Sequence, residues 1–342
     1  MDTVASVPPT DTEPAWAPIP FAVPAAGRPT AVTLYEVGAR DGLQNEPVTV
    51  DTATKAEFIR RLAAAGARTI EATSFVRPEW VPQLADAEAV LDHLAAGDAT
   101  RGVSLPVLVP NLRGYERARD RSDIDTIALF VSATESFSAR NLNTSIAKSL
   151  ADAETVAAAA LADGRRVRGY VSMCFADPWE GPTPIEQVVR TGQQLIAMGC
   201  YQLSLGDTIG VATPGHVVAL LQAFAAAGIP MSRLAVHFHD TYGQALANAA
   251  TALEAGVTTF DASAGGLGGC PFARNATGNL ATEDLVWMLH GMGIDTGLDL
   301  PALVRTSRWM AGRLGRPSSS RVVAAFAPQL LEAMPARPVS AR

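Results

Sequence analysis

The chain has 342 residues, 48% of them hydrophobic and 18% charged, which is enough apolar material for one large α/β domain or two smaller ones. Its 27 basic and 34 acidic residues give a net charge of -7 without long blocks of like charge, a pattern that argues against nucleic-acid binding. Charges, glycines or prolines interrupt every apolar run before the roughly 20 residues that a membrane-spanning helix requires. We therefore expect a soluble enzyme of small molecules that binds neither nucleic acid nor a membrane.

Residues 1–30 are rich in Pro, Ala, Thr and Asp, and we interpret them as a disordered extension. They contain no Lys and a single Arg, Arg28, so they resemble neither a secretory signal nor a transit peptide. Cys174, Cys200 and Cys270 show no paired spacing, which is typical of a reducing compartment. These features together predict a cytoplasmic protein.

From residue 31 to residue 325, short β-branched apolar runs alternate with Ala- and Leu-rich stretches of helical period, as in repeated βα units. The pattern predicts eight strands: Val32 to Val37, Thr69 to Thr73, Leu105 to Val109, Thr126 to Val131, Arg166 to Ser172, Gln202 to Leu205, Leu234 to Phe238, and Thr258 to Ala262. The helical patterns between them include Thr54 to Ala65, Ile146 to Ala162, Ile185 to Met198, His216 to Ala227, and Gln244 to Glu254. Residues 326–342 form a tail beyond this domain.

Several helical patterns end in glycine just before the next strand, at Gly66, Gly199, Gly228 and Gly256. Glycine adopts the left-handed cap conformation at low cost, so these residues mark helix-to-strand junctions. Eight βα units predict a TIM (β/α)8 barrel, which needs roughly 250 residues, and extra C-terminal helices account for the remaining length. An open doubly wound sheet is the alternative.

Polar residues directly follow the predicted strands: Arg40-Asp41, Glu71, Asn111, Glu135, Asp207, His239-Asp240, and the glycine-rich segment that begins at Gly265. In a TIM barrel the carboxyl ends of all strands meet at one mouth. We therefore expect the chemistry of this protein at that mouth.

His237 and His239 stand two residues apart on one predicted strand, so their imidazoles point to the same side and can bind one ion together. Asp41, at the end of the first strand, lies within reach across the mouth. Two imidazoles and a carboxylate suit Mg, Mn, Co or Zn about equally well, so ligand type alone does not select the metal. Two histidines that are merely hydrogen-bonded are the alternative.

The segment from Gly265 to Asn279 contains five glycines in 15 residues and includes Cys270. Such a loop can move, or can approach a ligand closely, and a phosphate-binding role is natural after the eighth strand. An exposed thiol, with a pKa of roughly 8.5, can also exchange a proton with a substrate. Asn279 offers a neutral oxygen that can complete a metal shell, and Thr282 to Asp284 should cap and charge the next helix.

Glu71 and Asp207 are carboxylates at strand ends, where either can orient a ligand or move a proton. Arg40 keeps its charge beside the predicted metal and is best read as a donor that stabilises an anion. A salt bridge within the barrel mouth is the alternative role for Arg40.

These motifs make the chain resemble the 3-hydroxy-3-methylglutaryl-CoA lyases, a family of the pyruvate carboxylase-like metallolyase barrels. The similarity runs from about Val32 to Val323. It is carried by the segments 36–46 (EVGARDGLQNE), 71–76 (EATSFV), 167–172 (VRGYVS), 204–210 (SLGDTIG) and 237–248 (HFHDTYGQALAN), and by the Cys270 loop.

The resemblance implies that a divalent cation, Mg or Mn, is held by Asp41, His237, His239 and Asn279. It implies that Arg40 stabilises the substrate carbonyl, that Cys270 is the active-site thiol, and that Glu71, Asp207 and His237 assist catalysis. Gln44, Ser74 and Arg168, together with Arg40, are expected to bind substrate. The implied reaction cleaves a coenzyme A thioester, 3-hydroxy-3-methylglutaryl-CoA, to acetoacetate and acetyl-CoA, and we expect a homodimer.

The chain departs from this family at Gly315-Arg-Pro317, where well-known members carry Asn-Arg-Lys, so it lacks one amide and one cation that would face the coenzyme A tail. A lyase for a longer 3-hydroxy-3-alkylglutaryl-CoA is one alternative. A Claisen-type synthase or an aldolase of the same superfamily is another, although such relatives generally carry a second domain and lack the loop thiol. A barrel retained only for binding is disfavoured because every matched position is present.

Overall fold

The computed structural model describes residues 20–269 and 278–326. Its main sheet consists of eight strands in parallel register, and their order around the sheet is β1 (Thr33–Glu36), β10 (Thr259–Ala262), β9 (Leu234–Phe238), β8 (Gln202–Asp207), β5 (Arg166–Ser172), β4 (Thr126–Ser132), β3 (Val107–Leu108) and β2 (Thr73–Ser74). A parallel bridge between Glu36 and Ile70 joins the first strand to the segment before β2. The sheet therefore closes into a TIM barrel, as predicted, and the open doubly wound alternative is excluded.

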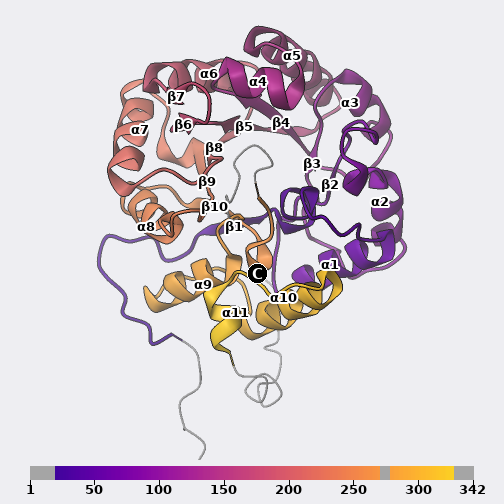
Figure 1. The fold of residues 1–342 in the computed structure, drawn as a ribbon, viewed down its shortest axis with the longest axis vertical. Helices are drawn as coiled ribbons and strands as arrows, with labels where there is room; N and C mark the ends of the chain where they lie inside the picture. Colours follow the sequence, from indigo (N-terminus) through magenta and orange to yellow (C-terminus); the bar gives the residue numbers. More distant parts are fainter. Residues whose placement is uncertain (1–19, 270–277, 327–342) are drawn as a thin grey trace, which may run out of the picture.

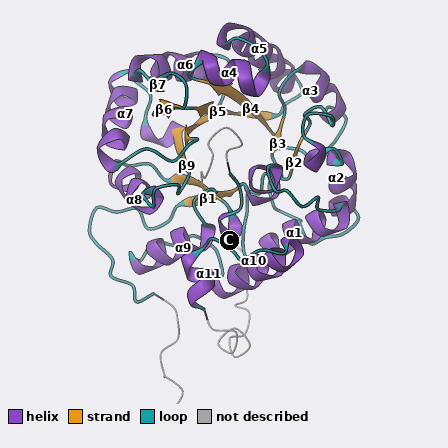
Figure 2. Ribbon diagram, viewed as in Figure 1, coloured by secondary structure: helices purple, strands orange, loops and turns teal. Residues whose placement is uncertain are grey.

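Helices surround the barrel (Figures 1 and 2). The outer ring contains α1 (Thr52–Ala64), α2 (Ala87–Ala95), α3 (Leu112–Ala118), α4 (Glu135–Leu142), α5 (Ile146–Ala162), α6 (Ile185–Ala197), α7 (Pro214–Ala226) and α8 (Ala245–Glu254). After β10 come α9 (Thr282–Gly291), α10 (Leu300–Leu314) and α11 (Arg321–Ala325), which gather beside α1 and α8 in Figure 1. These three are the extra C-terminal helices that the sequence predicts.

Short elements complete the chain: the π-helix η1 (Gly38–Gly42), the 3-10 turns η2 (Pro82–Leu84), η3 (Met231–Arg233) and η4 (Ala264–Gly266), and the hairpin of β6 (Ala176–Asp177) and β7 (Gly181–Pro182). The sequence did not predict this hairpin. Strands β2 and β3 are also shorter than predicted, because regular pairing there covers only two residues per strand.

The predicted glycine junctions are confirmed. Gly66, Gly199, Gly228 and Gly256 all have φ between +79° and +103°, the left-handed region in which a side chain is strained. At Gly66 a Cβ atom would also lie 2.2 Å from the carbonyl oxygen of Gly297. These residues end helices so that the chain can enter the next strand.

Residues 20–30 differ from the expected disordered extension. The amide of Val23 donates to the carbonyl of Gly291 at 2.8 Å, and the amide of Asp295 donates to the carbonyl of Thr30 at 2.9 Å. Arg28 pairs with Glu254 on α8 at 2.7 Å. This part of the extension lies along the barrel because main-chain partners are available there, whereas residues 1–19 and 327–342 lie outside the described residues.

The interior of the barrel is divided between apolar and polar side chains. Leu108, Ala128 and Tyr170, with Phe130 packed against them, fill the region between β3, β4 and β5. The region between β5, β8 and β10 instead holds buried Arg168, Ser204 and Asp261. Within the described ranges, no helix has the length and apolar character needed to cross a membrane.

Candidate metal centre and active site

A π-helix brings Arg40 and Asp41 to the mouth of the barrel directly after β1. The amide of Gly42 donates to the carbonyl of Val37 at 3.0 Å, five residues back, which is the spacing of a π-helical turn. A Cβ atom at Gly38 would lie 2.6 Å from Oε1 of Glu36, and one at Gly42 would lie 2.7 Å from Oγ of Ser263. Two glycines therefore allow the widened turn, a feature frequent at functional sites, to pack against the segment after β10.

Asp41, His237 and His239 gather their ligand atoms within 4.8 Å of one another. Nε2 of His237 lies 3.8 Å from Oδ2 of Asp41, and the two imidazole centroids are 5.4 Å apart. His237 belongs to β9, and His239 follows it on the same side, as the two-residue period of a strand requires. The predicted grouping of these three residues is therefore present.

Asn279 completes this cluster from the segment that precedes α9. Its Nδ2 donates to Oδ2 of Asp41 at 2.8 Å and to the carbonyl of Leu267 at 3.0 Å. Within the described part of the chain, no hydrogen-bond partner reaches the buried Oδ1 of Asn279 or the buried Nδ1 of His239. Buried polar atoms without partners are costly, so these two atoms indicate a place for a ligand.

The charges of the cluster suit a cation. Burial raises the pKa of Asp41, but Arg40 and the two histidines outweigh burial and hold that pKa at about 2. Burial, with the neighbouring His237, lowers the pKa of His239 to about 4. Near neutral pH, Asp41 is therefore an anion and His239 a neutral imidazole, which are the forms that bind metals.

Arg40 and Glu71 form a second buried group beside the first. Nη1 of Arg40 donates to Asp41 at 2.7 Å and Nη2 donates to Oε2 of Glu71 at 2.8 Å, while the hydroxyl of Tyr170 also donates to Oε2 at 3.0 Å. Burial raises the pKa of Glu71 despite the opposing charge of Arg40. Nε of Arg40 and Oε1 of Glu71 are buried and have no hydrogen-bond partner among the described residues, so one donor and one acceptor remain available.

Asp207 and Ser74, two other predicted residues, bond to the main chain. Asp207 accepts from the amides of Val211 and Ala212 at 3.0 Å each, so it fixes the loop after β8, and burial raises its pKa to about 6. The buried hydroxyl of Ser74 donates to the carbonyl of Leu108. Gln44 is partly buried just after the π-helix. Cys270 lies outside the described residues.

Arg168 differs from the expected substrate-binding residue. Its side chain is 0% exposed and pairs with Asp261, which is also 0% exposed, at 2.6 Å. The guanidinium lies below the metal-ligand cluster in the interior of the barrel because its strand position, four residues before Ser172 at the end of β5, points it inward. A fully enclosed ion pair offers no surface to a substrate.

The sequence reasoning gave no supporting role at the mouth to three buried acids, Glu36, Glu283 and Asp261. Glu36 accepts from the amides of Gly38 and Ala264 at 2.8 and 2.9 Å, and from the hydroxyl of Thr282 at 2.6 Å. Glu283 accepts from the amide of Gly265 at 2.9 Å, and Asp261 faces His237. The available signal was the presence of acids at the ends of otherwise apolar strands and at the start of α9.

Thr282 and Glu283 also correct the expected capping of α9. The helix has Ala281 at its N-cap and no side-chain cap, and both side chains instead bind residues from other elements. Thr282 and Glu283 help to hold η4 and the π-helix together. The sequence around the start of α9 could not predict these contacts, because their partners are distant in the chain.

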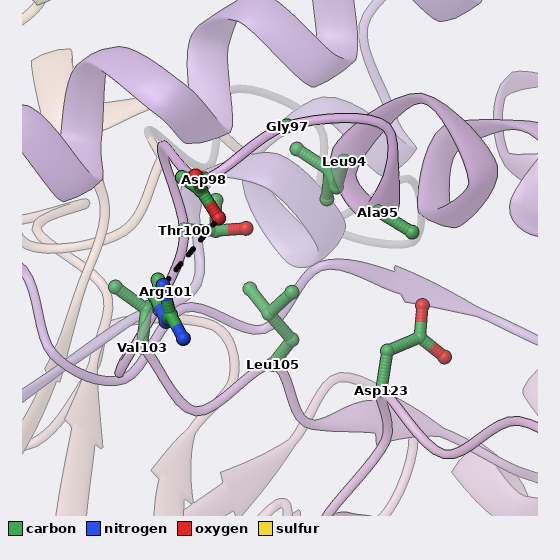
Figure 3. A pocket seen from close by; sticks show the side chains of 9 residues that line it. All are labelled: Leu94, Ala95, Gly97, Asp98, Thr100, Arg101, Val103, Leu105 and Asp123. Carbon is green, nitrogen blue, oxygen red and sulfur yellow. Dashed lines mark ion pairs between the residues drawn. The ribbon is translucent and has the colours of Figure 1, made fainter.

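A hollow at the surface, shown in Figure 3, does not compete with the mouth as a candidate site. Its lining includes Leu94 near the end of α2, and Arg101 and Asp123 from the connections before β3 and β4. These connections enter the amino ends of the strands, the face opposite the mouth. Its ion pair between Asp98 and Arg101 spans 3.9 Å, and both side chains are more than four-fifths exposed, so it is a solvated surface feature.

Comparison with known proteins places the chain among similar sequences and folds. The family model described as HMGL-like matches residues 31–310. The mitochondrial hydroxymethylglutaryl-CoA lyase of Arabidopsis thaliana is 48% identical over 300 residues, which cover 88% of this chain and 63% of that relative. The cytoplasmic 3-hydroxy-3-methylglutaryl-CoA lyase of Rattus norvegicus is 45% identical over 88% of this chain and 86% of its own length.

Solved structures of HMG-CoA lyases are also similar to this chain. The HMG-CoA lyase of Bacillus subtilis has a TM-score of 0.84 and 44% identity, with coverage of 89% of this chain and 99% of that chain. An HMG-CoA lyase of Acinetobacter baumannii, solved in complex with coenzyme A and 3-methylmalate, has a TM-score of 0.81 and 34% identity, with coverage of 87% of this chain and 96% of that chain.

Proposed function

Because this chain belongs to the HMGL-like family, we propose that it is a metal-dependent lyase that cleaves 3-hydroxy-3-methylglutaryl-CoA to acetoacetate and acetyl-CoA. Four side chains with the chemistry of metal ligands converge at the mouth of the barrel from the π-helix η1, from the end of β9 and from the segment before α9. This convergence is the observation that carries the proposal. The similarity to hydroxymethylglutaryl-CoA lyases supports the choice of substrate.

The residues at the mouth fit a divalent cation. Asp41 supplies an anionic oxygen, the histidines supply nitrogens, and Oδ1 of Asn279 is a buried acceptor without a partner among the described residues. A bound Mg or Mn ion would act as a Lewis acid toward the oxygens of the substrate. The two oxygen donors suit Mg and Mn and the two imidazoles also suit Zn, so the choice of Mg or Mn rests on the family resemblance.

Arg40 is placed to stabilise the charge that cleavage creates. When the carbon–carbon bond of the substrate breaks, an electron pair moves onto the thioester and leaves an enolate oxygen. Arg40 is fixed by Asp41 and Glu71, and its Nε–H is not used within the described structure. A charged donor held rigidly in a buried site stabilises such an oxygen without reorganisation.

Two proton transfers complete the reaction. The tertiary hydroxyl of the substrate must lose a proton as the ketone of acetoacetate forms, and the enolate carbon must gain one to give acetyl-CoA. Glu71 has a free, buried Oε1 and a raised pKa, so it can take part in proton movement at the mouth. On the basis of the family resemblance, we propose that the thiol of Cys270 also takes part in these proton transfers.

The departure at Gly315-Arg-Pro317 has a structural explanation. Gly315 ends α10 with φ of +66°, a conformation that glycine adopts readily, and Arg316 is bound to the carboxylate of Glu46. Arg316 therefore ties the end of α10 to the segment after the π-helix. We propose that coenzyme A binds with fewer contacts from this segment than in members with Asn-Arg-Lys.

The test is a product assay with the purified, reduced chain and Mn²⁺ or Mg²⁺. We expect acetoacetate and acetyl-CoA in equal amounts from 3-hydroxy-3-methylglutaryl-CoA, with loss of activity on chelation. A panel of 3-hydroxy-3-alkylglutaryl thioesters of increasing alkyl length, with equal metal and protein, measures the preferred chain length. Absence of acetoacetate from metal-loaded protein would refute the proposal, and faster cleavage of a longer homologue would assign the alternative substrate.

The assembly and the compartment remain predictions. We propose a homodimer, which sedimentation equilibrium of the purified chain would measure directly. Relatives named both mitochondrial and cytoplasmic are similar to this chain, so the cytoplasmic location is tested by fractionation of the source cells.

A further inference from the structure

A fully buried ion pair crosses the interior of the barrel beneath the candidate metal site. Nη2 of Arg168 on β5 donates to Oδ1 of Asp261 on β10 at 2.6 Å, and Nη1 donates to Oδ2 at 3.2 Å. The guanidinium lies 3.9 Å from the centroid of the Tyr35 ring and 4.9 Å from that of Tyr170. Burying two charges requires desolvation that often cancels their attraction, so stability alone is a weak explanation for this pair.

Asp261 faces His237 from the neighbouring strand. The two residues are direct partners in the register of β10 and β9. Nδ1 of His237 is buried and makes no hydrogen bond among the described residues, and Oδ2 of Asp261 lies 3.4 Å from it. Nε2 on the other side of the same ring lies 3.8 Å from Oδ2 of Asp41. The imidazole therefore stands between one carboxylate in the interior and one at the mouth.

The carboxylate of Asp261 is held in place from several directions. Besides Arg168, the hydroxyl of Ser204 donates to Oδ2 at 2.7 Å. Nε of Arg168 donates to Oε1 of Gln202 at 3.1 Å, and Nε2 of Gln202 donates to the hydroxyl of Thr259 at 3.0 Å. Rotation of Asp261 would break its bonds to Arg168 and Ser204, so its orientation toward His237 is fixed from β5 and β8.

We propose that Asp261, fixed by Arg168 and Ser204, is a positioning residue that accepts a hydrogen bond from Nδ1–H of His237 when the cation is bound and thereby presents Nε2 to the cation. A carboxylate on the second nitrogen fixes the tautomer and ring orientation of a metal-binding histidine and raises its basicity. This inference rests on the proposed metal site, and it assigns Arg168 to the support of His237 in place of the substrate contact expected from the sequence.

The experiment compares metal affinity in three single variants. Asp261→Asn removes the acceptor charge at constant size, and Ser204→Ala removes one hydrogen bond to the same oxygen. Thr259→Val is the matched control, since Thr259 lies two residues before Asp261 on the same strand and bonds only to Gln202 in the network. Mn²⁺ binding is measured by electron paramagnetic resonance without substrate, and the tautomer of His237 by nitrogen-15 NMR with Mg²⁺.

We expect Asp261→Asn to weaken Mn²⁺ binding about 10- to 100-fold and to change the nitrogen-15 shifts of His237. Ser204→Ala should weaken binding less, and Thr259→Val should not change it. Saturating Mn²⁺ should restore more of the turnover of Asp261→Asn than limiting Mn²⁺ does. Circular dichroism of each variant checks that the fold is retained.

If Asp261→Asn alone fails to fold, the double variant Arg168→Met with Asp261→Asn removes the unpaired buried cation and allows the same measurement. Mn²⁺ affinity within twofold of wild type, in either folded variant, would overturn the positioning role while leaving the proposed function intact. Wild-type protein that binds Mn²⁺ but releases no acetoacetate would refute the proposed function, and the comparison of affinities would still decide the role of Asp261.

Discussion

Two adjacent regions of this barrel bury polar groups in opposite ways. At the mouth, Oδ1 of Asn279, Nδ1 of His239 and Nε of Arg40 are buried without hydrogen-bond partners among the described residues. Beside the mouth, Glu36 accepts from three donors, and Glu283 accepts from the amide of Gly265 and the hydroxyl of Ser307. Because an unsatisfied buried group costs free energy, we interpret the unpartnered atoms at the mouth as contacts for a ligand and the acids with several donors as structural supports.

The largest expected effect comes from removing a ligand at the unsatisfied region. His239→Ala should abolish measurable metal binding and with it turnover, since the metal is expected to supply several kcal/mol of transition-state stabilisation. Bound Mn²⁺ is counted after gel filtration. His93→Ala, an exposed histidine on the outer helix α2, is the control and should keep both metal and activity. Full metal stoichiometry in His239→Ala would show that the histidine is not a ligand.

The sequence predicts those parts of the site whose residues are close together in the chain. His237 and His239 share one strand, so a two-residue period was enough to pair them. Asn111, Glu135 and Asp240 follow strands in the same way, yet Asn111 caps α3, Glu135 begins α4, and Asp240 accepts from the amide that starts α8. A polar residue after a strand can either belong to the site or start the next helix, and its sequence context is the same in both cases.

The barrel itself was more predictable than the support of its site. Eight strands and the glycine junctions follow from local patterns that persist in the structure. Asp261 and Arg168, however, meet across the interior from strands that are not neighbours in the sheet. No spacing in the sequence encodes that contact, because it depends on closure of the barrel and on the register of four strands.

Cys270 belongs to the segment that joins the two regions, between Gly265 and Asn279. Cys270→Ala should lower turnover about 10³-fold if the thiol transfers protons, since general acid–base catalysis contributes effects of this order. Metal content should not change, because the described ligands are elsewhere. Cys200→Ala is the matched control, as Cys200 is buried away from the mouth. Near-normal turnover in Cys270→Ala would remove the thiol from the mechanism.

Arg40→Lys tests whether the free donor at the mouth matters apart from charge. Lysine keeps the cation but cannot hold Asp41 and Glu71 while offering a third donor, so we expect turnover to fall about 10²-fold with metal binding retained. Arg61→Lys, on the outer face of α1 where Arg61 pairs with Glu57, is the control. If Arg40→Lys turned over at the wild-type rate, charge alone would suffice and the free Nε–H would have no role.

The smallest effect is expected in the satisfied region, where Glu283→Gln should change the pH dependence of stability. Burial raises the pKa of Glu283 to about 8, although Ser307 and backbone amides oppose the shift. A carboxyl with a raised pKa in the folded state contributes stability that is present below its unfolded pKa, roughly 4.5, and is lost as pH rises through the folded pKa. The unfolding free energy of wild type should therefore fall relative to Glu283→Gln between these two values, by up to about 1.4 kcal/mol per pH unit.

Urea denaturation at pH 5, 6, 7 and 8 measures this difference, with activity followed in parallel. Ser307→Ala serves as the control because it removes one donor but keeps the carboxyl, so its pH dependence should remain like that of wild type. Equal pH dependence in wild type and Glu283→Gln would mean that the carboxylate is fully stabilised by its donors at every pH tested. In that case, hydrogen-bond donors alone would be enough to keep the buried carboxylate of Glu283 ionised. The two regions would then differ only in whether a ligand can reach their buried polar atoms.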